Sequence, residues 1–237
     1  MTTTEDREYL PATSRHLPAT FYDTFNRLLG ARDAHWRLVA QAGIEPGQSV
    51  LEIGCGTGSV LLLAASAVPG TSMIGLDPDP RVLAIAARKA RRAGVRLRLD
   101  RGYADRLPYP DSSVDRVLSA LMLHHLPRDQ QQAALREVRR VLAPGGRLHL
   151  LDIDGSPPSR AGRLLRLGHV HTADEHGHGH GHEAGPHAHA TPEGALAALE
   201  QAGLVDAAVV AHGAMPLGGY SFYRATAPKE GADQLRP

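Results

Sequence analysis

The sequence contains one cysteine and almost no excess of charge of either sign. Cys55 stands alone among 237 residues, which excludes an intramolecular disulfide or a zinc site of several cysteines and favours a reducing compartment. Lys and Arg total 26 against 25 Asp and Glu, so a net charge of +1 gives no reason to expect nucleic acid or an anionic membrane as partner. No run approaches the roughly 18 apolar residues that cross a bilayer, and the polar start lacks the apolar region of a signal peptide. We therefore expect a soluble, cytoplasmic protein.

Strand and helix patterns alternate along the middle of the chain. Apolar strands are predicted at 49–53, 73–76, 95–99, 115–120 and 147–153, and helices at 59–68, 79–93 and 128–142. Together with strands near 204–211 and 220–227, this rhythm predicts a Rossmann-like α/β fold: a doubly wound, mostly parallel seven-stranded sheet with helices on both faces. Arginines alternating along 95–99 place that strand at a sheet edge. Ligands of such sheets bind at the rim formed by the carboxyl ends of the strands.

The length predicts one domain with an elaboration, because single domains average about 150 residues. We expect a flexible arm at 1–20 and a single domain at 21–237. Within the domain we expect preceding helices at 21–44, a ligand-binding core at 45–153, a His-rich insertion over the rim at 154–190, and the last helix and strands at 191–227.

A glycine loop joins the first strand to the first helix of the core. Gly54, Gly56 and Gly58 allow a tight turn and let a ligand lie against main-chain N–H groups at a helix start. Asp77 ends the next strand, where a carboxylate can accept hydrogen bonds from both hydroxyls of a ribose. The combination predicts a ligand that contains a nucleoside.

Two residues discriminate between nucleoside ligands. Dinucleotide loops have glycine where Ser59 stands, and they have an apolar residue where Glu52 stands. A buried carboxylate at Glu52 is costly unless the ligand compensates it, and an ammonium group would do so. S-adenosylmethionine carries an amino group and a ribose but no pyrophosphate, so it suits this loop better than NAD. An NAD-dependent oxidoreductase stays an alternative.

Four motifs in order resemble the class I S-adenosylmethionine-dependent methyltransferases, in the type 11 branch that includes the ubiquinone and menaquinone C-methyltransferases. The motifs are LEIGCGTG at 51–58, GYADRLPYPDSSVDRV at 102–117, LHHLP at 123–127 and REVRRVLAPGG at 136–146. They cover about residues 45–155. The resemblance implies an enzyme that transfers a methyl group in line from S-adenosylmethionine to an acceptor.

The resemblance also implies roles for single residues. Gly54, Gly56 and Gly58 would contact the methionine part of the donor, Asp77 the ribose and Pro78 the adenine, with Ala104 and Asp105 facing the adenine edge. Ser119 and Leu121 would line the sulfonium side. The family usually has Asp where Tyr103 stands, so either Tyr103 stacks on the base or Asp105 replaces the missing carboxylate.

The acceptor is less constrained than the donor. His124 and His125 lie just beyond the fourth strand and are the nearby residues suited to act as a general base, although a structural role in the turn is an alternative. No Asn-Pro-Pro-Tyr follows that strand, which disfavours the branch that methylates amino groups of nucleic acids. A small-molecule acceptor is therefore expected, with no nucleic acid or membrane partner. The oligomeric state is left open.

Histidine is concentrated in the insertion. Eight of the 14 histidines fall between His169 and His189, where Gly and His alternate. Imidazoles bind divalent transition metals, so a metal cofactor at this segment, and a metal-responsive or metal-binding protein on a methyltransferase scaffold, form an alternative hypothesis. A low-complexity insertion without a metal function is the competing interpretation.

Overall fold

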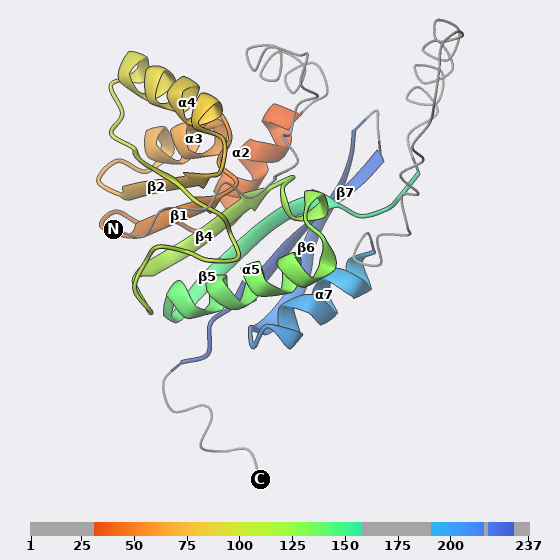
Figure 1. Cartoon of the computed structure of the whole chain (residues 1–237). Coiled ribbons are helices and arrows are strands. Elements are labelled where there is room, and N and C mark those ends of the chain that lie inside the picture. The colour runs from red at the N-terminus through yellow and green to blue at the C-terminus, as the bar shows by residue number, and fades with distance from the viewer. Residues whose placement is uncertain (1–30, 158–190, 216–217, 230–237) are drawn as a thin grey trace, which may run out of the picture.

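A computed structural model describes residues 31–157, 191–215 and 218–229. Seven strands form one sheet in the order β3-β2-β1-β4-β5-β7-β6 (Figure 1). The strands are β1 (Ser49–Ile53), β2 (Ser72–Asp77), β3 (Arg98–Arg101), β4 (Val114–Ala120), β5 (Leu142–Ile153), β6 (Val205–Met215) and β7 (Gly218–Thr226). The first five run parallel, and β7 pairs antiparallel with both β5 and β6. The predicted Rossmann-like, mostly parallel seven-stranded sheet is confirmed.

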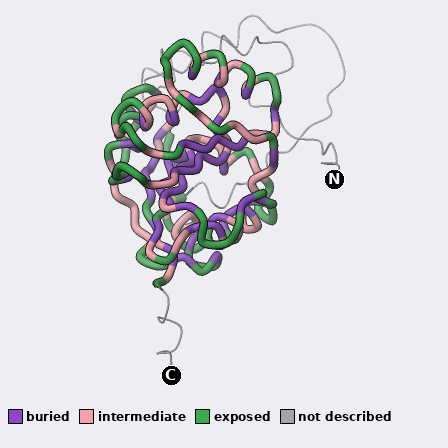
Figure 2. Tube along the Cα trace, turned by 90° about the vertical axis from the view of Figure 1, so that its left-hand side faces the viewer, coloured by how far each residue is buried: buried purple, intermediate pink, exposed green. Residues whose placement is uncertain are grey.

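Helices cover both faces of the sheet (Figure 1). They are α2 (Ala31–Gln41), α3 (Ser59–Ala67), α4 (Pro80–Ala93), the short 3-10 helix η1 (Leu123–His125), α5 (Arg128–Val141) and α7 (Pro192–Gln201). One buried apolar cluster lies between the sheet and the α2–α3–α4 side, and a second lies between the sheet and α5 and α7. Figure 2 shows the buried residues along the central strands and the exposed ones on the outer sides of the helices.

Capping explains where β3 begins. Gly94 ends α4 in the left-handed conformation at φ 65°, and the N–H of Val95 donates to the carbonyl of Ala90 at 3.0 Å. The residues after Gly94 therefore close the helix and connect it to the sheet. The strand predicted at 95–99 is accordingly displaced to Arg98–Arg101, although its predicted place at a sheet edge is confirmed.

The other boundaries differ in detail. Strand β5 begins at Leu142 and not at the predicted residue 147, and its register against β4 shifts within the added stretch. Strand β6 extends to Met215, beyond the predicted 204–211. The arm at 1–20, residues 21–30 and all eight histidines of the insertion lie outside the described residues. The division of the chain into these segments stays a prediction.

A buried histidine in β5 should make stability depend on pH. His149 is 2% exposed, and burial and the nearby Arg116, Arg147 and Arg224 lower its pKa to about 4. The unfolded chain takes up a proton near pH 6.5 that the folded chain does not accept until about pH 4. We expect the free energy of unfolding to fall by roughly 3 kcal/mol from this group as the pH drops from 7.5 to 4.

Urea unfolding of wild type and His149→Leu at several pH values measures this effect. The difference in unfolding free energy between the two proteins should shift in favour of His149→Leu below pH 6.5. Comparing the two proteins cancels the other titrating groups. A constant difference between pH 7.5 and 5 would contradict the prediction.

Candidate active site

The glycine loop forms the tight turn that the sequence predicts. Gly54, Gly56 and Gly58 all have positive φ values, of 67°, 50° and 75°. A Cβ on Gly54 would collide with the side chain of Met122, whereas a Cβ on Gly56 would meet nothing within 4 Å. The loop is thus packed against the segment after β4 on one side, and Gly56 adjoins open space where a ligand can approach the backbone.

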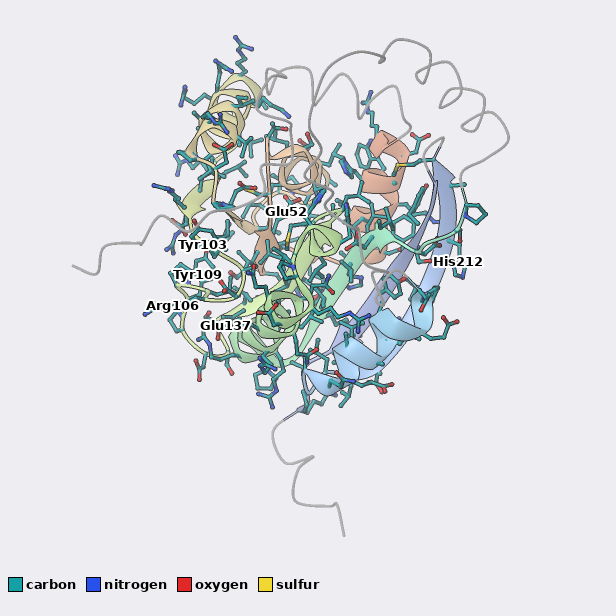
Figure 3. The ribbon with its side chains drawn as sticks, turned by 45° about the vertical axis from the view of Figure 1, so that its right-hand side comes forward. Glu52, Tyr103, Arg106, Tyr109, Glu137 and His212 are labelled. Atoms are coloured by element: carbon teal, nitrogen blue, oxygen red, sulfur yellow. The ribbon has the colours of Figure 1, made fainter. Side chains whose placement is uncertain are left out.

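Glu52 lies on β1, just before this loop, and points into the interior of the molecule (Figure 3). Its side chain is 2% exposed, hydrogen-bonds the backbone of Leu61 in the first turn of α3, and leaves Oε2 buried without a partner. Burial raises the pKa of Glu52 well above its usual range, and the nearby Lys89 opposes this rise. A buried carboxylate with one oxygen unsatisfied can accept a hydrogen bond from a cationic ligand.

Asp77 connects the end of β2 to the loop. Its Oδ2 accepts from the N–H of Gly56 at 2.9 Å, and its Oδ1 accepts from the N–H of Asp79 at 2.9 Å. Burial raises the pKa of this carboxyl, and the two backbone hydrogen bonds oppose the rise. Pro78 follows, and its carbonyl accepts from Nε of Arg101 at 3.2 Å. The carboxylate is therefore fixed in direction beside Gly56.

The segment after β3 lies next to Asp77. The N–H of Gly102 donates to the carbonyl of Asp77 at 3.2 Å, and the N–H of Arg106 donates to the carbonyl of Tyr103 at 3.2 Å. These bonds bring the predicted Tyr103, Ala104 and Asp105 to the same rim as Asp77, and all three are half-buried. Whether Tyr103 or Asp105 meets an adenine stays a prediction.

Arg140 on α5 forms hydrogen bonds with the residues that follow this segment. Arg140 donates to Glu137 at 2.8 Å, to the carbonyls of Leu107 and Tyr109 at 3.0 and 2.8 Å, and to Asp111 at 2.6 Å. Glu137 in turn accepts from the N–H of Leu107 at 2.7 Å, and its pKa is lowered chiefly by its hydrogen bond with Arg140. The loop that carries Tyr103 is thereby tied to a helix on the far face of the sheet.

Removing this anchor should loosen the loop. We expect Arg140→Ala to lower the free energy of unfolding by about 2–3 kcal/mol, because several hydrogen bonds are lost and two carbonyls lose a partner. Affinity for the donor should fall severalfold as the loop loses order. Chemical denaturation and calorimetry measure the two effects. Arg136→Ala, an exposed arginine of the same helix, is the control and should change neither.

The carboxyl ends of β4 and β5 complete the rim. Ser119 is fully buried on β4, its hydroxyl has no hydrogen-bond partner, and it pairs with Ile53 of β1 and Leu150 of β5. Leu121 follows with a φ of 55°, an uncommon conformation for leucine that turns the chain toward Met122. Because neighbouring strands lie about 4.8 Å apart, the glycine loop and the end of β5 are separated by roughly 10 Å.

His124 forms a pair with an aspartate that sequence reasoning missed. Its Nδ1 is hydrogen-bonded to Asp152 Oδ1, and its backbone N–H donates to Asp152 Oδ2 at 3.0 Å. Asp152 is 6% exposed and comes at the end of β5. Its position at a strand end on the predicted rim was the available signal. His125 is exposed, with its ring centroid 4.0 Å from that of His124.

The His124–Asp152 pair lines a pocket at the carboxyl end of β5, between the sheet, α5 and α7. Its other polar lining residues are Gln131 and Tyr223. The rest of the lining is apolar: Leu123, Leu135, Leu150, Ile153, Ala195, Ala198 and Leu199. His125 does not belong to this lining. Nδ1 of His124 faces Asp152, which leaves Nε2 as the atom able to exchange a proton with a ligand.

Comparison with known proteins connects these motifs to one family. A family described as a methyltransferase domain matches residues 50–146. A demethylmenaquinone methyltransferase from Deinococcus radiodurans is 34% identical over 179 residues, which cover 74% of this chain and 73% of that protein. The chain belongs to the class I S-adenosylmethionine-dependent methyltransferases. Another demethylmenaquinone methyltransferase, from Thermus thermophilus, is 36% identical over 149 residues, 62% of this chain and 67% of that protein.

The methyltransferase fold agrees with solved structures. An S-adenosylmethionine-dependent methyltransferase from Aquifex aeolicus superimposes with a TM-score of 0.62 at 18% identity, covering 89% of this chain and 99% of that one. The [4+2]-cyclase SpnF superimposes equally well, at 0.62 and 20% identity over 84% of this chain and 81% of its own, so this likeness shows the fold alone.

Membership in the family decides between the ligands considered above. This methyltransferase uses S-adenosylmethionine as its donor and lies in the branch of the ubiquinone and menaquinone C-methyltransferases, which excludes the NAD-dependent alternative. Among the described residues, no group of three or more His, Cys, Asp or Glu side chains could hold a metal ion. No helix of the described part is long and apolar enough to cross a membrane.

Sequence reasoning also missed the contact of Lys89 with the glycine loop. Its Nζ donates to Thr57 Oγ1 at 3.2 Å and to Ser59 Oγ at 3.0 Å, on either side of Gly58. Lys89 is one of only two lysines in the sequence, and it comes from α4, 30 residues beyond Ser59. Its rarity among 26 basic residues was the only signal in the sequence.

Proposed function

We propose that this methyltransferase methylates a ring carbon of an apolar small molecule that carries an acidic hydroxyl, of the hydroquinone class. The names of the relatives, demethylmenaquinone methyltransferase and ubiquinone/menaquinone biosynthesis C-methyltransferase, support this class of acceptor. The observation that carries the proposal is the His124–Asp152 pair in a largely apolar pocket at the carboxyl end of β5, two strands along the rim from the glycine loop. An apolar ring fits the lining, and its hydroxyl needs a base.

The donor site in this proposal is built from the loop and the two strand ends beside it. S-adenosylmethionine supplies a methyl group made electrophilic by its sulfonium. Gly56 leaves space for the methionine part, and the unsatisfied Oε2 of Glu52 accepts from its ammonium group. Asp77 accepts from the ribose hydroxyls. Pro78 and residues 103–105 flank the adenine, and Ser119 and Leu121 border the sulfonium side.

His124 moves the proton in the acceptor site. Nε2 takes the proton of the acceptor hydroxyl, and Asp152 stabilises the imidazolium that results. The electron pair released to the ring makes a ring carbon nucleophilic, and the new C–C bond forms as the S–C bond breaks. The same carbon then loses its hydrogen as a proton, which restores the aromatic ring, and the ring oxygen takes back the proton held by His124. One proton leaves for each methyl group transferred.

The proposed reaction has only small molecules as its partners. A small molecule is the acceptor, and neither nucleic acid nor a membrane is required, in keeping with a net charge of +1. The cytoplasmic location stays a prediction.

Methyl transfer to 1,4-dihydroxynaphthalene tests the proposed function. The full chain is incubated with labelled S-adenosylmethionine and this diol without oxygen, which would oxidise it. We expect a ring-methylated product by mass spectrometry, with one equivalent of S-adenosylhomocysteine. The control acceptor, 2,3-dimethyl-1,4-dihydroxynaphthalene, has no free carbon beside the hydroxyl-bearing carbons and should give no such product. Binding of the donor without transfer to any hydroquinone would contradict the proposed acceptor class.

A further inference from the structure

One tyrosine in the pocket has a hydroxyl that the fold does not use. Tyr223 lies on β7, is 1% exposed and lines the pocket, and its Oη is buried without a hydrogen-bond partner. A buried hydroxyl left unsatisfied is destabilising, and phenylalanine would fill the same space without that cost. We therefore expect a group of a bound ligand to form the missing hydrogen bond with this hydroxyl.

The strand register puts Tyr223 next to the base pair. Tyr223 is the cross-strand neighbour of Leu150, and Ser221 is the neighbour of Asp152. Leu150 and Asp152 share one face of β5, so Tyr223 and Asp152 project to the same side as diagonal neighbours, about 7–8 Å apart at Cα. A long side chain spans this separation. Tyr223 and His124 are thus two polar groups on one apolar pocket.

The charges around Tyr223 keep its hydroxyl protonated. Burial raises its pKa to about 12, the nearby Ser221 hydroxyl opposes this rise, and the carboxylates of Asp154, Asp152 and Glu193 add to it. A protonated phenol donates a hydrogen bond. The acceptor atom that suits it is a neutral or partly negative oxygen at the end of the ligand that does not meet His124.

We propose that Tyr223 is a positioning residue for the methyl acceptor: Oη donates a hydrogen bond to a second oxygen of the acceptor, whose first oxygen meets His124. This inference rests on the proposed function and adds a specificity rule to it. Acceptors with oxygens at two opposite positions of a ring system are favoured over those with one. Tyr223 orients the ring and takes no part in proton transfer.

Tyr223→Phe tests the proposal with two probe ligands. Binding of 1,4-dihydroxynaphthalene and of 1-naphthol to the S-adenosylhomocysteine-loaded protein is measured by calorimetry, and KM and kcat are measured with the diol. Wild type should prefer the diol by about tenfold, and Tyr223→Phe should lose that preference. KM for the diol should rise about tenfold with kcat changed less than threefold, and binding of 1-naphthol should not change.

Tyr109→Phe is the matched control. Tyr109 is also buried, but its hydroxyl donates to Asp100 at 3.1 Å and it does not line the pocket. Its substitution should lower thermal stability and keep the preference for the diol, whereas Tyr223→Phe should be at least as stable as wild type. An unchanged preference in Tyr223→Phe overturns this inference and leaves the proposed function standing. Failure of wild type to bind either ligand overturns both.

Discussion

Replacing Asp77 by alanine should weaken the binding of S-adenosylmethionine by roughly 100-fold or more, because two hydrogen bonds to a carboxylate contribute about 1.5–3 kcal/mol each. The carboxylate also holds the N–H groups of Gly56 and Asp79, so its loss leaves the loop less ordered as well. Calorimetric titration with S-adenosylmethionine and with S-adenosylhomocysteine measures the effect. Both ligands carry the ribose, so both should lose affinity to the same extent.

Asp115→Ala is the control. Like Asp77, Asp115 accepts a hydrogen bond from a backbone N–H, but it lies away from the rim. Asp115 Oδ2 accepts from the N–H of Ser49 at 2.8 Å, at the amino ends of β4 and β1. Its loss should lower stability and leave donor affinity within about twofold, since it is remote from the rim. Equal donor affinity in Asp77→Ala and wild type would remove Asp77 from the donor site.

Replacing His124 by alanine should lower kcat by about 100- to 10,000-fold, the usual contribution of a general base. KM for the donor should stay close to that of wild type, because the donor loop is untouched. Steady-state kinetics with 1,4-dihydroxynaphthalene measure both kcat and KM.

Two further substitutions separate the roles at this site. Asp152→Asn should lower kcat by about 10- to 100-fold, because an amide orients the imidazole less well and cannot stabilise its charged form. His125→Ala should lower kcat by less than about tenfold, since the exposed ring of His125 is outside the pocket. A larger loss of kcat in His125→Ala than in His124→Ala would contradict the assignment of His124 as the base.

The geometry of the glycine loop and of Asp77 could be predicted because these parts are local in sequence. Gly54, Gly56 and Gly58 follow one strand and precede one helix, and a tight turn between them has few solutions. Asp77 ends the next strand, and parallel strands bring their carboxyl ends to one edge. The edge position of β3 followed from its alternating arginines. Both ends of β3 were misplaced, because the end of α4 uses the residues after Gly94.

The acceptor half required the tertiary structure. Asp152 follows His124 by 28 residues, and their pairing depends on β5 lying beside β4. Tyr223 reaches the pocket because β7 inserts antiparallel between β5 and β6, against the order of the chain. Neither the neighbour of a strand nor its register can be read from the local pattern of residues, because both depend on packing between residues that are far apart in the sequence.

By itself, then, the sequence determined the alternating fold, the tight turn of the glycine loop and the family, because each depends on short-range spacing. The tertiary structure decided which of two adjacent histidines has a carboxylate partner, and which polar groups share an apolar pocket. The physical reason is burial: Asp152 and Tyr223 are enclosed by strands and helices that meet only in the folded chain. Desolvation gives those polar groups the strength to bind or to move a proton, and it arises only from that packing.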